Sequence, residues 1–123
     1  MDQIVPLFSA EDIAKKNAIV EDKSPQELLE WAMDTMHPRL ALSSSFGAED
    51  VVLIDMMCRI NRSARVFTLD TLRLPTETYT VMDQIQTKYG IELETYYPDM
   101  NQVAKMVREN GFNLFYKSEQ FRK

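Results

Sequence analysis

The sequence predicts an α/β protein built on a parallel sheet of three strands with flanking helices. Two observations support this fold class. Short apolar segments at residues 39–43, 65–69 and 92–97 alternate with longer segments whose apolar residues recur at helical spacing. Strands that alternate with helices form parallel sheets with right-handed crossovers. A turn of small residues follows the first strand and leads directly into a helix, which is an arrangement typical of anion-binding loops.

Two helices are expected before the sheet. Residues 1–8 are short and irregular around Pro6, and Ser9 is the expected N-cap of a helix that ends near Val20. A second helix starts at Ser24 and Pro25, with a capping box, and ends at residues 37–38. We expect residues 1–38 to form a helical segment that packs on an α/β domain of residues 39–123.

The remaining elements follow from apolar spacing and from turn residues. Residues 48–60 are apolar around most of the helix circumference, so this helix is expected to be buried on more than one side. Pro75 is the expected first residue of the next helix, and Gly90 its C-cap. Apolar and polar residues alternate in residues 92–97, which indicates an edge strand. A helix of residues 101–110 ends at Gly111, and residues 113–123 form a last short helix.

Composition excludes several functional classes. The chain has 123 residues with a net charge of −5, which argues against a nucleic-acid-binding protein. No apolar run is long enough to span a bilayer, and the first residues lack the features of a secretory signal. Cys58 is the only cysteine, so no internal disulfide can form, as is usual in the reducing cytoplasm. We therefore expect a cytoplasmic protein without membrane or nucleic-acid partners.

The turn after the first strand is the first candidate site. Helix N-termini carry free N–H groups and partial positive charge, serine hydroxyls add donors, and Gly47 allows the backbone to approach a ligand oxygen closely. An ordinary strand-to-helix turn with a serine N-cap would give the same pattern. A second stretch, residues 69–79, also follows a strand. Because ligands bind at the carboxyl ends of parallel strands, we expect the two stretches to line one crevice.

Three motifs resemble those of the adenylyl-sulfate and phosphoadenylyl-sulfate reductases. Residues 45–50 are similar to the modified pyrophosphate loop of that family. Residues 69–71 and 73–79 look like its second signature, and residues 113–123 resemble the segment before the paired cysteines of its cluster-bearing members. The resemblance covers the chain from about Leu40 to its last residue, with the motifs in family order.

The resemblance implies a three-layer sheet of the adenine-nucleotide (pyrophosphate-loop) hydrolase-like type, of which this chain supplies an incomplete part. It implies adenylyl sulfate or phosphoadenylyl sulfate as the substrate, with thioredoxin or glutaredoxin as partner of the full-length enzyme, and allows a [4Fe–4S] cluster there. The chain's resemblance to cluster-bearing members favours adenylyl sulfate. The substrate-binding residues that the resemblance implies are Ser43, Ser44, Ser45, Phe46, Gly47, Glu49, Asp50, Leu69, Asp70, Thr71 and Arg73.

Two departures from the family pattern are evident. The family usually has glycine where this chain has Leu72. The family's cysteine pairs and catalytic cysteine would lie beyond Lys123, so we expect the nucleotide-binding N-terminal half of an enzyme, without reductase activity alone.

Cys58 lies among apolar helical residues and is expected in the core, and His37, the only histidine, has no partner for catalysis or zinc binding.

Several residues have two possible roles. Glu49 and Asp50 are expected to stabilise the helix start. Beside an anion site they would repel the ligand, unless they point aside, bind a bridging cation or hold loop donors in place. Asp70 accepts from a ribose hydroxyl or caps a turn, and Arg73 pairs with an anion or lies on the surface. At the level of function, one alternative is a relative that activates substrates with ATP through a pyrophosphate loop. Another is an adenine-nucleotide-binding or structural module without catalysis, or an inert truncation product.

Residues 39–43 are also expected to form a sheet edge in this chain. In the family order the strand lies centrally, and its neighbours on one side come from later sequence. An exposed apolar edge is a template for pairing with another chain, so we expect a homo-oligomer.

Overall fold

The structure, a computed structural model, describes residues 8–122. Two helices, α1 (Ala10–Val20) and α2 (Pro25–Met36), precede the sheet. The sheet region follows as β1 (Ala41–Ser43), α3 (Ala48–Ile60), β2 (Arg65–Leu69), α4 (Thr76–Tyr89) and β3 (Glu94–Tyr96). The chain then forms α5 (Met100–Asn110), α6 (Leu114–Lys117) and the 3₁₀ helix η1 (Glu119–Arg122). The α/β fold class is therefore confirmed.

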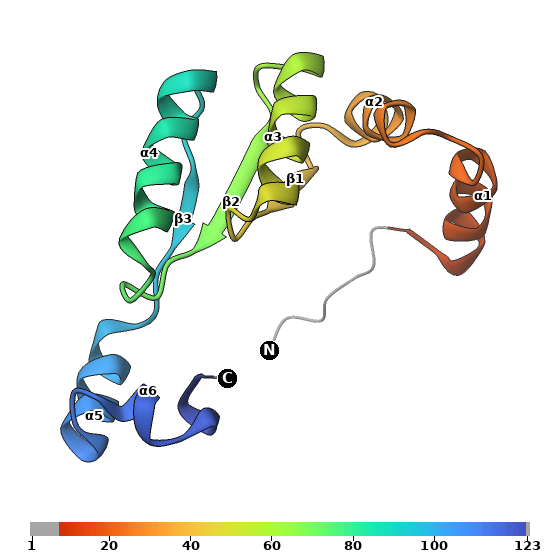
Figure 1. The fold of residues 1–123 in the computed structure, drawn as a ribbon. Coiled ribbons are helices and arrows are strands. Elements are labelled where there is room, and N and C mark those ends of the chain that lie inside the picture. The colour runs from red at the N-terminus through yellow and green to blue at the C-terminus, as the bar shows by residue number, and fades with distance from the viewer. Residues whose placement is uncertain (1–7, 123) are drawn as a thin grey trace.

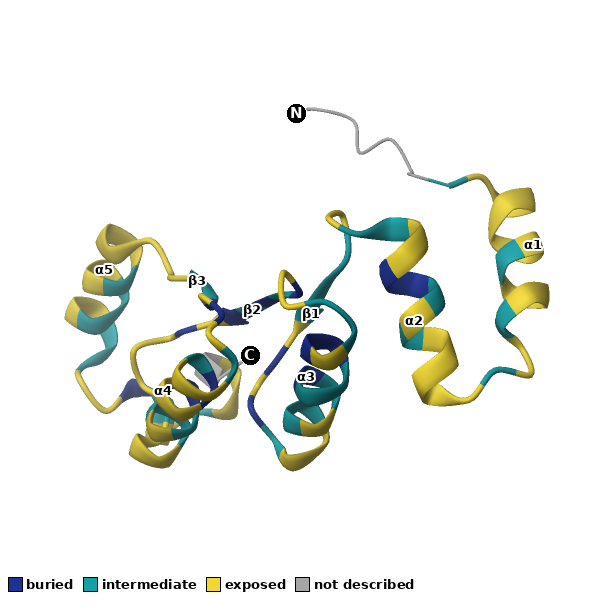
Figure 2. Ribbon diagram, turned by 90° about the horizontal axis from the view of Figure 1, so that it is seen from above, coloured by how far each residue is buried: buried dark blue, intermediate teal, exposed yellow. Residues whose placement is uncertain are grey.

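The three strands are parallel and lie in the order β1-β2-β3. Leu42 is aligned with Val66, and Thr68 with Thr95. Helices α3 and α4 lie on the same face of the sheet (Figures 1 and 2). Val66 and Thr68 are buried beneath these helices, whereas Leu69, at the end of β2, is 66% exposed. The core therefore forms between one face of the sheet and the two crossover helices.

Helix α3 is covered by the sheet and by α2, as its apolar circumference predicts. Ile54, Met57 and Cys58 are buried, and α2 contributes Met33 to the same core cluster. Val52, however, is 56% exposed, so one apolar side of this helix meets solvent in the described residues. Cys58 is a core residue, as expected.

The predicted N-caps of α1 and α2 are both present. Ser9 and Ser24 accept hydrogen bonds from the backbone N–H groups three residues later, and the carboxylates of Asp12 and Glu27 accept from the backbone of the caps in return. These reciprocal bonds satisfy donors that a helix start leaves free. The expectation for residues 1–7 lies outside the described residues.

Three predicted boundaries were wrong, each for a local reason. β1 begins at Ala41 rather than at residue 39, because Arg39 N–H donates to Met36 O in the turn after α2. β3 begins at Glu94, because the side chain of Gln86 accepts from Leu93 N–H. Pro75 is the N-cap of α4 rather than its first residue.

The expected last helix is instead α6 followed by η1. Ser118 between them has an extended backbone and accepts from Gln120 N–H through its hydroxyl, which interrupts the helix. Both short elements lie beyond the carboxyl ends of the strands, with α6 beside α5 (Figure 1). None of the helices within residues 8–122 combines the length and the hydrophobicity needed to cross a bilayer.

Within the described residues, β1 pairs with β2 alone, so its other edge is free. We expect the chain to self-associate through this edge, most simply as a two-fold dimer. Ser44 N–H donates to Phe67 O in β2, so by alternation the N–H of Ala41 points to the free edge.

Light scattering on dilute protein measures this state. The variant Ala41→Pro removes one outward donor without removing a bond to β2, and it should shift the protein to monomer. A monomeric parent protein would contradict the prediction.

Candidate functional site

The loop between β1 and α3 is organised by the carboxylate of Asp50. Its Oδ2 accepts from the backbone N–H of Ser45 at 2.8 Å and from the hydroxyls of Ser44 at 3.3 Å and Ser45 at 3.2 Å. These bonds, the backbone one first, hold the pKa of Asp50 below its usual value. Asp50 lies in the first turn of α3, and of the other roles predicted for it the structure shows one: its carboxylate holds the loop donors in place.

Ser44 connects the loop to the sheet. It is buried, and its N–H donates to Phe67 O at 2.9 Å. Its hydroxyl oxygen accepts from Phe46 N–H at 3.0 Å while donating to Asp50. Ser43, by contrast, ends β1 as an exposed residue. Ser44 and Ser45 therefore bind the organising carboxylate, whereas Ser43, which is exposed like Ser45, has no side-chain hydrogen bond within residues 8–122.

Phe46 has a left-handed backbone, with φ of 63°, although its side chain is bulky. Such a backbone costs an ordinary residue free energy and is retained only where surrounding contacts fix it. Here the ring is 8% exposed and belongs to the core cluster. The core thus holds the loop in a shape that a free chain would avoid.

Gly47 is the N-cap of α3, and no side chain caps this helix. The first N–H groups of α3 are therefore without a side-chain cap, and the helix dipole places partial positive charge beside them. Gly47 has an ordinary φ of −66°, so a left-handed backbone does not explain the glycine. A Cβ built there would lie 3.0 Å from the carboxylate oxygens of Glu49, which therefore reaches back over the helix start.

In the loop after β2, the carboxylate of Asp70 likewise accepts a hydrogen bond from a backbone N–H of the loop. This residue is 6% exposed, its N–H donates to Tyr96 O, and its Oδ1 accepts from Leu72 N–H and from the Tyr79 hydroxyl, both at 2.7 Å. The bond to Asp70 is the main cause of a raised pKa at Tyr79. Asp70 Oδ2 has no hydrogen-bond partner within residues 8–122.

Leu72 has a left-handed backbone with φ of 64°, which accounts for the glycine usual at this position in the resembling family. Its side chain is 52% exposed. Thr71 accepts from Arg73 N–H through its hydroxyl at 3.3 Å, which closes the turn. Leu69 is 66% exposed at the end of β2, and its side chain contributes little to the core.

Arg73 is exposed, but its side chain contacts residues near the end of the chain. Its Nη1 donates to Phe112 O at 3.1 Å, and its guanidinium carbon lies 4.6 Å from the centre of the Phe115 ring. The sequence predicts neither this contact nor the bond from Tyr79 to Asp70. Helical spacing places Tyr79 on an apolar helix face without indicating a partner for its hydroxyl, and Phe112 is distant from Arg73 in sequence.

The two loops leave neighbouring strands at the same edge of the sheet. β1 ends where Ser43 is aligned with Phe67, three residues before Asp70. Both loops lie at the end of the sheet near α5 and α6 (Figure 1). Parallel strands place ligands at this edge. The predicted site residues therefore gather at one end of the molecule.

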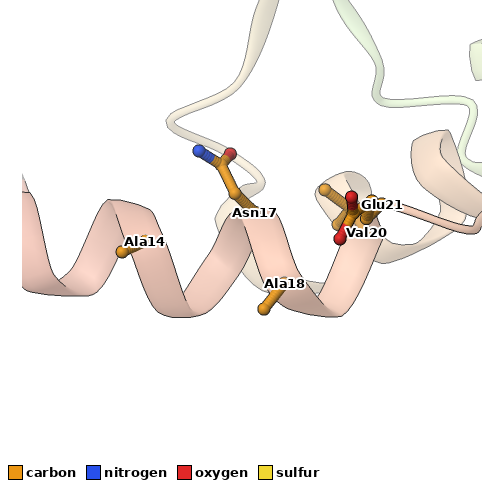
Figure 3. Close-up of a pocket in the computed structure, with 5 residues that line it drawn as sticks. All are labelled: Ala14, Asn17, Ala18, Val20 and Glu21. Atoms are coloured by element: carbon orange, nitrogen blue, oxygen red, sulfur yellow. The ribbon is translucent and has the colours of Figure 1, made fainter.

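Two hollows of the surface lie away from these loops. One of about 500 Å³ lies along α1 and is lined by Ala14, Asn17, Ala18, Val20 and Glu21 (Figure 3). Another, of about 790 Å³, lies at the far ends of α3 and α4 and includes Cys58. Neither contains a predicted site residue. The candidate site is therefore defined by the geometry of its two loops.

Metal-binding and thiol chemistry have little support in the described residues. No group of three or more histidine, cysteine or acidic side chains within residues 8–122 could hold a metal ion. Burial, followed by the charge of Asp55, raises the pKa of the Cys58 thiol, which disfavours the reactive thiolate. A [4Fe–4S] cluster is held by about four cysteine thiolates. With one cysteine in the sequence, the residues present do not fit such a cluster.

Residues 39–123 match the family model described as "Phosphoadenosine phosphosulfate reductase domain". The chain is 40% identical over 112 residues to an adenosine 5′-phosphosulfate reductase of Pseudomonas aeruginosa, with 91% of this chain and 42% of that protein covered. It is 38% identical to 5′-adenylylsulfate reductase 1 of Arabidopsis thaliana over 94% of this chain and 24% of the plant protein.

A crystal structure of phosphoadenylyl-sulfate reductase from Candida auris is also similar. It superposes with a TM-score of 0.73 at 26% identity, covering 93% of this chain and 56% of that one. The chain therefore spans 42% of the length of the bacterial relative and 24% of the plant relative.

Leu72 provides a direct test of backbone strain. Leu72→Gly is expected to be more stable to unfolding than Leu72→Ala by up to about 1 kcal/mol, because only glycine adopts a left-handed backbone without a steric cost. Chemical denaturation of both variants measures the difference. As a control, Leu28 is an exposed leucine within α2, where alanine should be the more stable replacement by about 1 kcal/mol. Alanine being better at both positions would contradict the left-handed backbone at Leu72.

Asp50 should make stability depend on pH. Its folded pKa lies below the unfolded value near 3.8, so its stabilisation is complete above that value and is lost as pH falls through the folded pKa. Asp50→Asn should therefore cost about 1 kcal/mol near pH 7, from a weakened set of hydrogen bonds, and progressively less below pH about 4. Denaturation at a series of pH values measures this.

The control is Asp83→Asn, an exposed carboxylate of α4 without a hydrogen bond or ion pair in residues 8–122. This substitution should have little effect at any pH. An Asp50→Asn penalty that does not change with pH would show that the charge of Asp50 is unimportant.

Proposed function

Because the chain belongs to the phosphoadenosine phosphosulfate reductase domain family, we propose that it is the nucleotide-binding part of an enzyme that reduces an adenylyl sulfate to sulfite. The bacterial and plant relatives are named for adenosine 5′-phosphosulfate, and they are more similar in sequence than the phosphoadenylyl-sulfate reductase structure. Adenylyl sulfate is therefore the substrate that we favour, with phosphoadenylyl sulfate as the alternative.

The arrangement of the two loops carries this proposal. Each leaves the carboxyl end of a parallel strand, each contains a non-glycine residue with a left-handed backbone, and each is fixed by one aspartate. Loops held in strained conformations are common at ligand sites, where the shape is needed in advance of binding. Here the strained residue Phe46 directly precedes the start of α3, which has no side-chain cap. A helix start of this kind stabilises an anionic group.

The proposed roles follow the geometry. The N–H groups at the start of α3 and the exposed Ser43 receive the anionic part of the nucleotide, and Glu49 moves aside from Gly47 to admit it. Asp70 Oδ2, without a partner in residues 8–122, accepts a ribose hydroxyl, while Oδ1 continues to hold the loop. Asp50 and Ser44 maintain the loop shape and do not contact the ligand.

The reductive step needs a nucleophile that the described residues do not supply. In the proposed chemistry a cysteine thiolate attacks the sulfur, the adenylate leaves, and thioredoxin or glutaredoxin then releases sulfite. Cys58 is 8% exposed within α3, and its pKa is raised, so it is unsuited to this role. We propose that this chain binds the nucleotide without reducing it, and that the enzyme acts in the cytoplasm.

Isothermal titration calorimetry with adenosine 5′-phosphosulfate tests the proposed site. The parent chain should bind, and Gly47→Val should weaken binding by about tenfold or more, because a branched side chain obstructs the start of α3. Ser63→Val makes a comparable change in an exposed turn after the other end of α3 and should leave binding unchanged. Equal affinity of parent and Gly47→Val would place the ligand elsewhere.

A parallel titration with ATP separates the alternatives. Binding of ATP in preference to adenosine 5′-phosphosulfate would favour an ATP-dependent pyrophosphate-loop protein. Binding of neither nucleotide would favour a structural module.

A further inference from the structure

We propose that Arg73 is a positioning residue whose side chain fastens residues 112–117 to the loop of residues 70–75, so that docking of that segment and nucleotide binding at the loop are coupled. The coupling rests on the proposed function, namely a nucleotide site at this edge of the sheet. The fastening itself is a property of the free protein and does not depend on any ligand.

Arg73 makes two contacts with the segment, of different kinds. Nη1 donates to the carbonyl oxygen of Phe112 at 3.1 Å, which is an ordinary hydrogen bond. The guanidinium carbon lies 4.6 Å from the centre of the Phe115 ring, within the range of a cation–π interaction. Arg73 has no ion pair within residues 8–122, so these contacts are the ones that orient its side chain.

The main chain of Arg73 is fixed as well. Its N–H donates to the Thr71 hydroxyl, and the preceding residue, Leu72, has the left-handed backbone and donates to Asp70. The loop conformation therefore determines where the Arg73 side chain starts. Conversely, a docked segment restricts the loop through the same residue.

Within residues 8–122, few other hydrogen bonds hold the segment. Leu114 is fully buried, and Lys117 Nζ donates to Asn110 O at 2.6 Å. Phe112 and Tyr116 are 80% and 86% exposed. Loss of the Arg73 contacts should therefore loosen the segment without unfolding the sheet, because Leu114 and the core remain.

Coupling follows from reciprocity. If the docked segment favours the loop shape that binds nucleotide, a bound nucleotide must favour the docked segment by the same factor. The factor is limited by the strength of the contacts that join them. An exposed cation–π interaction sets it at about two- to fivefold in affinity.

Phe115→Leu is the decisive variant, because it removes the ring and keeps the charge of Arg73. Hydrogen exchange of the free protein should become faster at the Leu72 and Arg73 amides and within residues 112–117. Affinity for adenosine 5′-phosphosulfate, measured by calorimetry, should fall about two- to fivefold. In the parent, the nucleotide should slow exchange within residues 112–117, and in Phe115→Leu this protection should be lost.

Three control variants isolate the contact between Arg73 and the Phe115 ring. Phe115→Tyr retains the ring and should behave as the parent. Arg59→Gln removes an exposed arginine paired with Asp55 at the far end of α3 and should change neither exchange nor affinity. The double variant Arg73→Gln with Phe115→Leu should bind adenosine 5′-phosphosulfate no more weakly than Arg73→Gln alone. The reason is that Arg73→Gln already removes the contact that Phe115→Leu removes.

Two results would overturn the inference. Unchanged exchange at Leu72 and Arg73 in Phe115→Leu would show that the segment does not position the loop. A normal affinity of Phe115→Leu beside a weakened Arg73→Gln would show that Arg73 contacts the anion directly. Failure of the proposed function gives a different result, because the parent protein itself would then bind no nucleotide. The coupling would be refuted in that case. Hydrogen exchange of the free protein would still decide whether Arg73 positions the loop.

Discussion

One carboxylate oxygen, Asp50 Oδ2, holds the geometry on which the candidate site depends. It gathers the backbone N–H of Ser45 and two serine hydroxyls, and so turns the chain from β1 into α3. A charged acceptor makes stronger hydrogen bonds than a neutral one, and here a single acceptor serves three donors. An acid can therefore stand beside the proposed anion site, because its charge is directed at the donors of the loop.

The loop after β2 is also fixed by one aspartate and also contains a residue with a left-handed backbone. Asp70 accepts from the N–H of Leu72, as Asp50 accepts from that of Ser45, and each loop includes a residue with φ above 60°. The two differ in what stabilises the unfavourable backbone. Phe46 is anchored by its buried ring, whereas the exposed side chain of Leu72 gives little such support. The second loop relies instead on Asp70, on Tyr79 and on the connection through Arg73.

The two loops therefore contact different parts of the molecule. The first is anchored in the core by the ring of Phe46. The second is tied by Arg73 to residues 112–117, which lie outside the sheet and expose Phe112 and Tyr116. Structural change in that segment can therefore reach the second loop directly, and the first only through the core. In the proposed function, both loops border the nucleotide site.

The sequence by itself determined the fold class, the limits of α3 and β2, the N-caps of α1 and α2 and the capping box of α2. These features rest on local causes: apolar spacing, serine at a helix start and glycine at a helix end act within a few residues. It also marked Leu72 as a position where glycine was expected. Tertiary structure alone decided how the site residues are used. Asp70 meets Tyr79 across a turn, and Arg73 meets Phe112 and Phe115 about forty residues later. Such contacts depend on which elements the sheet brings together, and no local pattern records them.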